Sequence, residues 1–513
     1  MKKIRKISLM VLALVMALQL SACSSGAPSA PSDSAAPSAS GDSYLSEDGY
    51  DSEYDPYYDY SGGERYSEIE ETGWRYADEQ PEATFSLKVD TASYSNVKRY
   101  IEDWRMPPKD AVRTEELINW FGYDEPLVFE KGSPFAFYTE VGPSPFSKES
   151  YLAFVRVGTR PVEKENLPPS NLVFLIDISG SMSSADKLPL LQNAFAMLTE
   201  TLGEDDVVSI VTYASGTKVA LAGASGSETR KINKTIYGLK SGGSTAGGKG
   251  IELAYELAEE FFIEGGNNRV ILATDGDFNV GISDTKELSR FITKKRDTGV
   301  YLSVLGFGTG NIRDDIMETL AKDGNGNYSY IDSRKTAEKV LIDELASNLF
   351  TVADDVKAQM VFDPDTVYSY RLIGYENRML NKKDFDNDRK DAGELGAGSD
   401  VIALFEFEPY DTGEGFSSRD HLFDVRIRYK DPGDSRSQLI EFPVTGKALS
   451  GRNTTDFGFV SAVAMFGDYL RNGDDYRGGD IYGIISLAED NLGRDASGYR
   501  EDFVDLLYTL QEI

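Results

Sequence analysis

The hydrophobic pattern of the middle third of the chain alternates between strand-like and helix-like segments. It opens with Asn171–Ile176, a continuous apolar run of the kind that parallel sheets bury on both faces. Strands separated by helices imply right-handed crossovers, so we predict an α/β fold with a doubly wound, mostly parallel sheet. The later segments that follow this alternation are strands at 207–213, 269–274, 300–306 and 328–331, and helices at 187–202, 248–263, 285–297, 312–321 and 335–350.

Less regular patterns flank this core on both sides. Before it, short strand-like and helix-like segments alternate with breaks rich in Pro and Gly. After it, the pattern becomes β-rich and closes with helical stretches near 455–470, 480–491 and 498–512. We therefore predict an N-terminal α+β region at 82–169, the α/β domain at 170–350, and a C-terminal β-rich plus helical region at 351–513.

The first 23 residues have the layout of an export signal. Basic residues in Met1–Lys6 precede the apolar run Ile7–Leu20, which is shorter than the roughly 20 residues that span a bilayer. The run ends in Leu20-Ser-Ala-Cys23, which resembles the lipobox of bacterial lipoproteins. By that resemblance residues 1–22 are removed and the Cys23 thiol carries a diacylglycerol, whose acyl chains anchor the protein durably. An ordinary signal with a buried apolar Cys is the alternative.

This resemblance implies a location at the cell membrane, with the protein anchored by lipid on the extracytoplasmic face. The plasma membrane and an outer-membrane leaflet both stay open. Residues 23–81 then read as an acidic linker, because Ser, Ala, Pro and Gly dominate 24–40, and 41–80 hold 13 acids against two arginines. Eight tyrosines interleaved with those acids leave a second interpretation, a docking strip for a basic partner.

Composition removes several classes of function. The chain has 53 Lys and Arg against 85 Asp and Glu, a net charge of −32, so nucleic acid is an unfavourable partner. A single Cys excludes intrachain disulfides and cysteine zinc clusters. The only His, His421, leaves little room for histidine-dependent catalysis, and we interpret it as structural.

Hydroxyl and carboxylate side chains gather where the predicted strands end. Asp177, Ser179 and Ser181 follow the first buried strand, and Asp275 follows the strand at 269–274. Thr245 lies between them in a Gly-rich loop that opens a helix. Ligands of doubly wound sheets bind at the carboxyl ends of the strands, so these three loops are expected to converge. Hard oxygen ligands without His or Cys favour Mg²⁺ or Mn²⁺ over zinc.

These residues match the metal-ion-dependent adhesion site of von Willebrand factor type A domains, and the resemblance spans 171–350. It implies direct coordination by the hydroxyls of Ser179, Ser181 and Thr245. Asp177 and Asp275 would coordinate directly or through water, and a protein partner would supply an Asp or Glu to the open position. The alternative is a set of turn-capping residues without an ion. Asp277, two residues beyond Asp275, is expected to be a solvated or outer-shell residue.

A wider resemblance links the chain to bacterial secreted lipoproteins that carry a type A domain between an N-terminal region and a C-terminal region of unknown function. The motifs that carry it are Val89–Val97, Arg113–Asn119, Thr274–Gly281, Arg371–Arg378 and Asp391–Ser399. Ser399 stands where we expect His in many relatives. The resemblance implies an architecture more than an activity.

Two motifs fall short of the sites they suggest. Gly243–Gly250 resembles a phosphate-binding loop but ends in Gly where Ser or Thr must hold magnesium, so no nucleotide is expected. Asp384–Arg389 begins like a calcium loop but has Arg389 at the sixth position, where Gly is required.

The sequence therefore predicts a non-enzymatic, surface-anchored adhesion or recognition protein that binds a partner's carboxylate through Mg²⁺. Two alternatives remain. In the first, a structural or assembly protein closes the metal site with its own flanking domains. In the second, the protein is a metal-dependent hydrolase, for which the sequence offers no evident general base.

Overall fold

The computed structural model describes residues 63–163, 166–244, 249–276, 285–410, 416–449, 452–473, 476 and 478–513. Cys23, Thr245 and Asp277 lie outside the described residues. In the described part of the chain, no helix combines the length and apolarity needed to cross a membrane.

The predicted first strand forms β5 (Ser170–Asp177), in which every residue is buried. It pairs in parallel with β6 (Val207–Tyr213) and β8 (Asn267–Thr274). The sheet has the order β10-β9-β8-β5-β6-β7, where β9 (Val300–Phe307) and β10 (Tyr328–Ile331) continue it in parallel. Only the edge strand β7 (Thr217–Ser225) runs antiparallel. The prediction of a doubly wound, mostly parallel sheet is confirmed.

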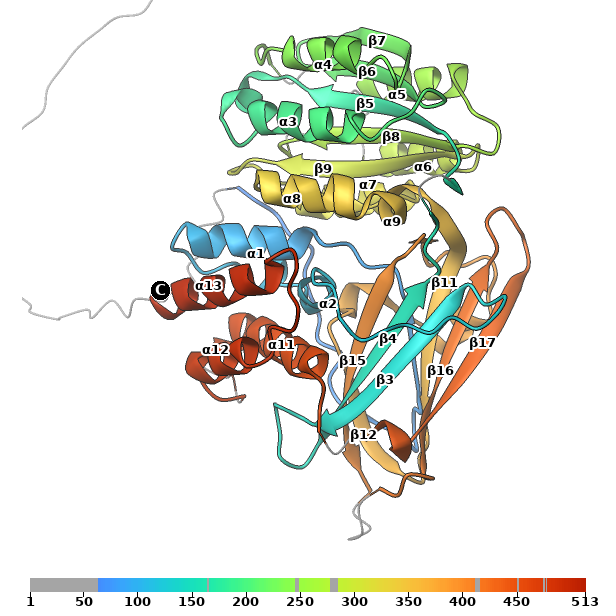
Figure 1. Ribbon diagram of the computed structural model, residues 1–513, viewed down its shortest axis with the longest axis vertical. Helices are drawn as coiled ribbons and strands as arrows, with labels where there is room; N and C mark the ends of the chain where they lie inside the picture. Colours follow the sequence, from blue (N-terminus) through green and yellow to red (C-terminus); the bar gives the residue numbers. More distant parts are fainter. Residues whose placement is uncertain are drawn as a thin grey trace, which may run out of the picture. The chain divides into compact units, whose positions relative to one another are not determined.

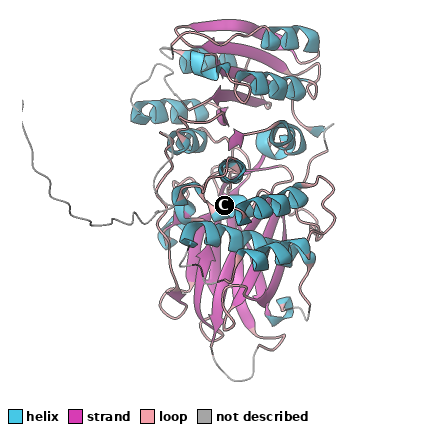
Figure 2. Cartoon of the chain, turned by 90° about the vertical axis from the view of Figure 1, so that its left-hand side faces the viewer, coloured by secondary structure: helices cyan, strands magenta, loops and turns pink. Residues whose placement is uncertain are grey.

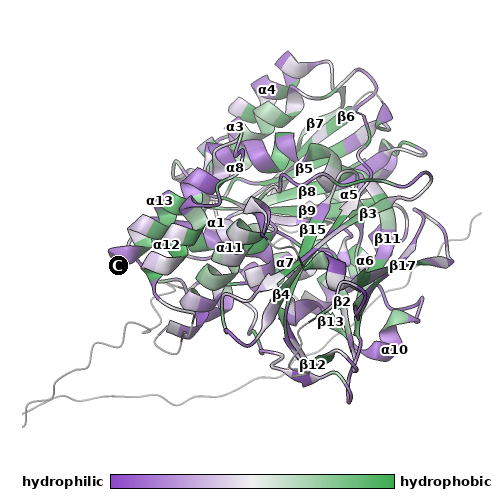
Figure 3. Cartoon of the chain, turned by 60° about the horizontal axis from the view of Figure 1, so that its bottom comes forward, coloured by the Kyte–Doolittle hydropathy of each residue, from purple (hydrophilic) through white to green (hydrophobic). Residues whose placement is uncertain are grey.

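Alternate residues of β5 enter two different cores because successive side chains of a strand point to opposite faces. Val173 and Leu175 pack with α5 (Gly250–Glu260), α6 (Thr285–Arg296) and α7 (Asp314–Asp323). Leu172 and Phe174 pack with α3 (Leu188–Thr199), α4 (Thr229–Tyr237) and α8 (Arg334–Glu338). Helices therefore cover both faces of the sheet (Figures 1 and 2). Figure 3 shows the hydrophobic colour running along the central strands β5, β8 and β9.

The two flanking regions combine into one structure instead of two. Five strands form the sheet β1-β12-β15-β4-β3, and five more form the sheet β13-β2-β11-β16-β17, with β14 pairing to β11. Each sheet mixes strands from both sides of the α/β domain, which is therefore an insertion between β4 and β11. The strands concerned are β1 (Arg75–Tyr76), β2 (Glu82–Ser86), β3 (Phe135–Pro143), β4 (Tyr151–Thr159), β11 (Thr351–Phe362), β12 (Val367–Ile373), β13 (Met379–Leu380), β14 (Leu395–Gly396), β15 (Asp400–Pro409), β16 (His421–Lys430) and β17 (Ser437–Thr445).

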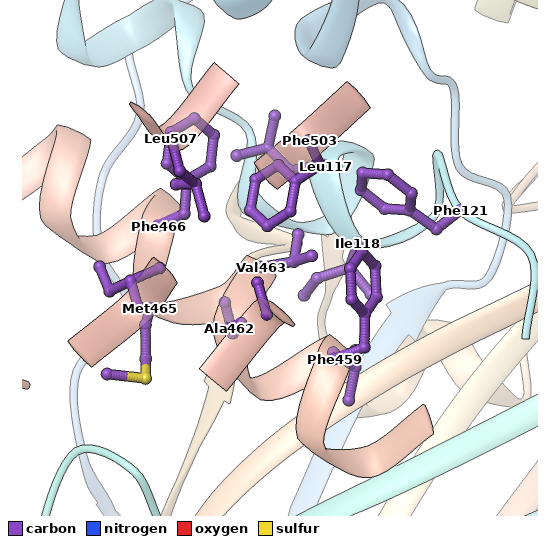
Figure 4. Close-up of a cluster of buried hydrophobic side chains, with 14 of the residues drawn as sticks. Leu117, Ile118, Phe121, Phe459, Ala462, Val463, Met465, Phe466, Phe503 and Leu507 are labelled. Atoms are coloured by element: carbon purple, nitrogen blue, oxygen red, sulfur yellow. The ribbon is translucent and has the colours of Figure 1, made fainter. Parts of the chain in front are cut away.

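Helices from the two flanking regions also share a core. α1 (Ala92–Glu102) and α2 (Thr114–Ile118) pack with α11 (Thr455–Asn472), α12 (Ile481–Glu489) and α13 (Tyr499–Gln511). Figure 4 shows Leu117 and Phe121 meeting Phe459 and Phe503 in this core. The ring centroids of Phe121 and Phe459 are 5.0 Å apart in an edge-to-face arrangement. The shorter helical segments are α9 (Leu345–Leu349), α10 (Lys382–Phe385), the π-helix Lys339–Asp343 and 3₁₀ turns at Lys109–Ala111, Gly180–Ser183, Glu376–Arg378 and Gly446–Ala448.

Structure begins before the predicted end of the linker at residue 81. β1 pairs with β12, and Glu64 is buried against Arg99 at 2.8 Å. The sequence does not reveal this boundary, because Glu64 lies within a run of acidic residues that are expected to be solvated.

A buried cluster of charged side chains ties the inserted domain to both flanking regions. Arg113 lies 2.6 Å from Asp314 of α7 and 2.7 Å from Glu116. Arg378 reaches Asp90 at 3.0 Å and Glu116 at 3.3 Å. Buried charges are tolerated when they are paired and hydrogen-bonded, and burial of one partner without the other is strongly unfavourable.

We therefore expect Arg113→Met to lower the free energy of unfolding by about 3 kcal/mol or more, because Asp314 loses the cation that pairs with it and Glu116 keeps only that of Arg378. Urea denaturation measures the change. The control is Arg105→Met, whose ion pair with Asp103 is exposed and worth at most about 1 kcal/mol. Equal losses in the two variants would contradict a stabilising role for the buried cluster.

Candidate metal site

The first loop of the candidate site leaves β5 at its carboxyl end. Asp177 is fully buried, and its Oδ1 accepts a hydrogen bond from the Ser179 backbone N–H at 2.8 Å. The hydroxyl oxygens of Ser179 and Ser181 lie 2.9 Å apart. The predicted carboxylate and both predicted hydroxyls of this loop are therefore together at one edge of the sheet.

The Gly-rich loop runs alongside the first one. The Gly180 N–H donates to the Gly243 carbonyl at 3.0 Å, and the Gly242 N–H donates to the Ile178 carbonyl at 2.8 Å. These bonds hold the residues that precede Thr245 against the Ser179 loop. The hydroxyl of Thr245 itself stays a prediction, since that residue is not described.

Asp275 enters the same edge from the neighbouring strand β8. Ile176 of β5 pairs with Ala273 of β8, so both chains leave the sheet together, and Asp275 is fully buried. The pKa of Asp177 is raised to about 6, mainly by burial and with a smaller contribution from the nearby charge of Asp275, against the lowering effect of the Ser179 hydrogen bonds. Two carboxylates buried side by side make this edge favourable for a cation.

Lys187 is the residue at this edge that sequence reasoning missed. Its Nζ donates to Asp275 Oδ2 at 2.9 Å, and its side chain is almost fully buried. The sequence placed Lys187 inside a predicted helix, whereas the helix α3 begins one residue later. A lone lysine directly before the apolar run Leu188–Leu191 was the available signal.

A further loop, Gly308–Arg313, packs against the turn that carries Asp275. Gly276 has φ +106°, and a Cβ there would lie 2.4 Å from the Asn311 carbonyl oxygen, so the turn requires glycine. The same loop is held from its other side by the segment Gly63–Tyr66. The Gly310 N–H donates to Glu64 at 2.9 Å, and the Arg65 N–H donates to the Ile312 carbonyl at 2.9 Å.

Other residues that the sequence singled out are engaged within the chain. The ring of His421 lies between Asp363 and Asp424, at 3.2 and 2.9 Å. Asn381 is the N-cap of α10, and Asp384 completes the capping box by accepting a hydrogen bond from the Asn381 backbone N–H. Asp388 pairs with Arg428 at 3.0 Å. In the described ranges, no three His, Cys, Asp or Glu side chains gather as metal ligands. A metal site there would therefore depend on hydroxyl oxygens such as those of Ser179 and Ser181.

Glu394 and Ser399 line a separate polar cavity of about 180 Å³ together with residues of the inserted domain such as Lys339 and Asn348. Glu394 is buried, and its Oε2 has no hydrogen-bond partner among the described residues. Burial raises the pKa of Glu394 to about 8, with Lys88 opposing the shift and Asp391 and Asp354 adding to it.

This pKa predicts how stability depends on pH. Between the unfolded value near 4.5 and about 8, the folded state keeps a proton on Glu394 that the unfolded state loses, so stability falls as the pH rises. Above pH 8 the cost is complete. Glu394→Gln should therefore be more stable than the wild type at pH 8.5 by about 1 kcal/mol or more, with the difference vanishing near pH 4.5. Urea unfolding at both pH values, with exposed Glu264→Gln as control, measures this difference; a pH-independent difference would refute it.

Comparison with protein families divides the chain into three matching segments. Residues 60–153 match the family "von Willebrand factor", 171–344 match "von Willebrand factor type A domain", and 347–513 match "Uncharacterized protein YfbK, C-terminal". The model of the type A domain thus covers the inserted α/β domain and the strand ends described above.

Individual proteins are also similar to this chain. The uncharacterized protein YfbK of Escherichia coli K12 is 41% identical over 466 residues, covering 87% of this chain and 81% of its own length. Human inter-alpha-trypsin inhibitor heavy chain H3 is 25% identical over 272 residues. The aligned region covers 50% of this chain and 30% of that protein. A solved structure titled von Willebrand factor type A from Catenulispora acidiphila covers 74% of this chain and 91% of its own, with 17% identity and a TM-score of 0.43.

Proposed function

Since the chain belongs to the family of the YfbK protein and carries a von Willebrand factor type A domain, we propose that it is a lipid-anchored recognition protein that binds a carboxylate of a protein partner through Mg²⁺ or Mn²⁺. The observation that carries this proposal is the convergence of Asp177, Ser179, Ser181 and Asp275 at one edge of the sheet. Similarity to inter-alpha-trypsin inhibitor heavy chains is consistent with a role in protein interaction.

The chemistry of the donors fits such an ion. All are oxygens, two are neutral hydroxyls 2.9 Å apart, and the two carboxylates are buried. Ser179, Ser181, Asp177 and Asp275 would hold the ion, with Thr245 added by the family resemblance. When bound, the ion would offer a coordination position to an Asp or Glu of the partner, because neutral hydroxyl ligands leave it electron-poor.

A second candidate function, in which the chain closes its own site, is favoured by one observation. The segment Gly63–Tyr66 contacts the loop Gly308–Arg313, which packs against the Asp275 turn. The hydrolase alternative is less well supported. Asp177 accepts hydrogen bonds from Ser179 and Asp275 pairs with Lys187, so neither carboxylate is placed as a general base.

The metal site is tested by titrating Mn²⁺ into a soluble form that lacks residues 1–23 and keeps every described residue. A form that begins at Glu82 would lose the buried Glu64 and β1. We expect Asp177→Ala to weaken Mn²⁺ binding by at least about 100-fold, beyond the roughly 10–100-fold lost with an outer-shell partner. The exposed Asp205→Ala is the matched control. Absence of binding by the wild type at millimolar Mn²⁺ would end the proposal.

The partner is tested by affinity capture from detergent-solubilised membranes. Capture should require Mg²⁺, disappear with EDTA and fail with Asp177→Ala. A partner that is captured equally well by the wild type and by Asp177→Ala would show recognition that does not pass through the metal site.

The anchor is tested at Cys23. Lipidation of that thiol would hold the protein in the membrane through two or three acyl chains, each CH₂ contributing about 0.8 kcal/mol. We expect Cys23→Ser to move the protein from the membrane fraction to the soluble fraction and to abolish incorporation of labelled palmitate. The substitution Ser24→Ala should change neither, and membrane retention of Cys23→Ser would contradict a lipid anchor.

A further inference from the structure

The ammonium of Lys187 lies inside the candidate cation site. Its Nζ is 2.9 Å from Asp275 Oδ2, and the two side chains are 9% and 0% exposed. A buried, hydrogen-bonded ion pair of this kind is costly to break from either side, because the remaining charge stays in a medium of low dielectric constant. Lys187 is therefore a fixed part of the charge distribution at this edge of the sheet.

Backbone segments at the start of α3 and at Gly308 contact Lys187. Lys187 stands at the residue before α3, and the backbone N–H of Leu191 donates to its carbonyl at 2.9 Å. Its aliphatic stem passes over Gly308, where an added Cβ would lie 2.1 Å from Cε and 2.3 Å from Cγ. Gly308 has φ +72°, and its carbonyl accepts a hydrogen bond from the Tyr330 hydroxyl. The start of α3 therefore fixes the backbone of Lys187, and the Gly308 loop packs against the stem that carries its ammonium to Asp275.

Counting charges shows the effect of this arrangement. Asp177 and Asp275 carry −2 when ionised, and Lys187 reduces the total to −1. A divalent ion added with Lys187 in place leaves +1, whereas the same ion without the lysine leaves zero. Like charges repel strongly in a buried site, so the lysine opposes the binding of a cation alone. It also leaves a positive charge that one carboxylate from outside neutralises.

We propose that Lys187 is a built-in counter-cation that lowers the affinity of the site for a divalent cation alone and couples cation binding to binding of a carboxylate ligand. This inference rests on the proposed function, since it concerns regulation of the same site. Coupling is reciprocal: if the carboxylate strengthens binding of the cation, the cation strengthens binding of the carboxylate by the same factor. The lysine thus makes the site selective for the pair over either component.

The experiment compares Mn²⁺ affinity in the soluble form lacking residues 1–23, as the wild type and as Lys187→Met, Lys187→Gln and Lys187→Arg. Met keeps most of the apolar stem over Gly308 and removes the charge. We expect Lys187→Met to bind Mn²⁺ at least tenfold more tightly than the wild type, and Lys187→Arg to stay within about threefold. Lys187→Gln should also bind more tightly, and it replaces the Met variant if that protein does not fold.

Two further readouts separate a charge effect from a change in packing. In EDTA, Lys187→Met should melt at a lower temperature than the wild type because Asp275 is left buried without its cation, and Mn²⁺ should raise its melting temperature by more than it raises that of the wild type. Acetate at constant ionic strength should strengthen Mn²⁺ binding to the wild type more than to Lys187→Met, once acetate complexes of Mn²⁺ in solution are subtracted.

The outcomes distinguish this inference from the proposed function. If no form binds Mn²⁺, both fail. If the wild type binds Mn²⁺ and the Met and Gln variants bind it equally or more weakly, only the role of Lys187 is overturned. If only Lys187→Met binds Mn²⁺, the lysine suppresses cation binding as inferred, but the proposed function of the natural chain fails because the wild type does not bind the metal.

Discussion

The parallel pairing of β5 with β8 is the constraint on which the candidate site depends. Because Ile176 and Ala273 are in register, the two chains leave the sheet at the same edge and carry Asp177 and Asp275 into one buried region. An antiparallel pair would send the two carboxylates to opposite ends. The cost of burying both is offset locally by the Ser179 amide, by the Thr274 hydroxyl 3.5 Å from Asp177, and by Lys187. The parallel topology thus gathers the polar residues that follow β5 and β8 at one edge, and the surrounding loops supply their hydrogen-bond and ion-pair partners.

The same topology decides how the rest of the chain is arranged. The α/β domain is inserted between β4 and β11, so its two ends enter a pair of sheets that contain strands from both flanking regions. Each flanking region supplies strands that pair with strands of the other. β4 pairs with β3 and β15, and β11 pairs with β2 and β16. Arg113 and Arg378 bring this structure against Asp314 and Glu318 of the inserted domain, so the contact is made by charges paired in a buried setting.

The sequence predicted those parts of the structure that depend on residues close together in the chain, such as single strands and the loops that follow them. The apolar run Asn171–Ile176 was long enough to identify a doubly buried strand, and the order of the predicted strands then placed Asp177 and Asp275 at one edge. The pairing of β2 with β11 joins residues 271 to 279 positions apart, and the alternation of side chains within either strand does not identify its partner. Because the sequence does not identify strand partners, it predicts separate N-terminal and C-terminal regions, whereas the structure joins them in shared sheets.

The roles of Lys187 and Glu64 could not be predicted from the sequence, because both side chains contact the loop Gly308–Arg313, which is distant from them in the sequence. Lys187 passes over Gly308 to reach Asp275, Gly276 packs against Asn311, and Glu64 accepts a hydrogen bond from Gly310. Contacts that share one loop are energetically coupled and do not contribute independently. Burial opposes ionisation of Glu64, but the charge of Arg99 and the hydrogen bonds from Arg99, Gly310 and Tyr100 together lower its pKa, so it holds the loop as a charged group. The segment Gly63–Tyr66, at the end of the predicted linker, and the turn that carries Asp275 thus contact the same loop.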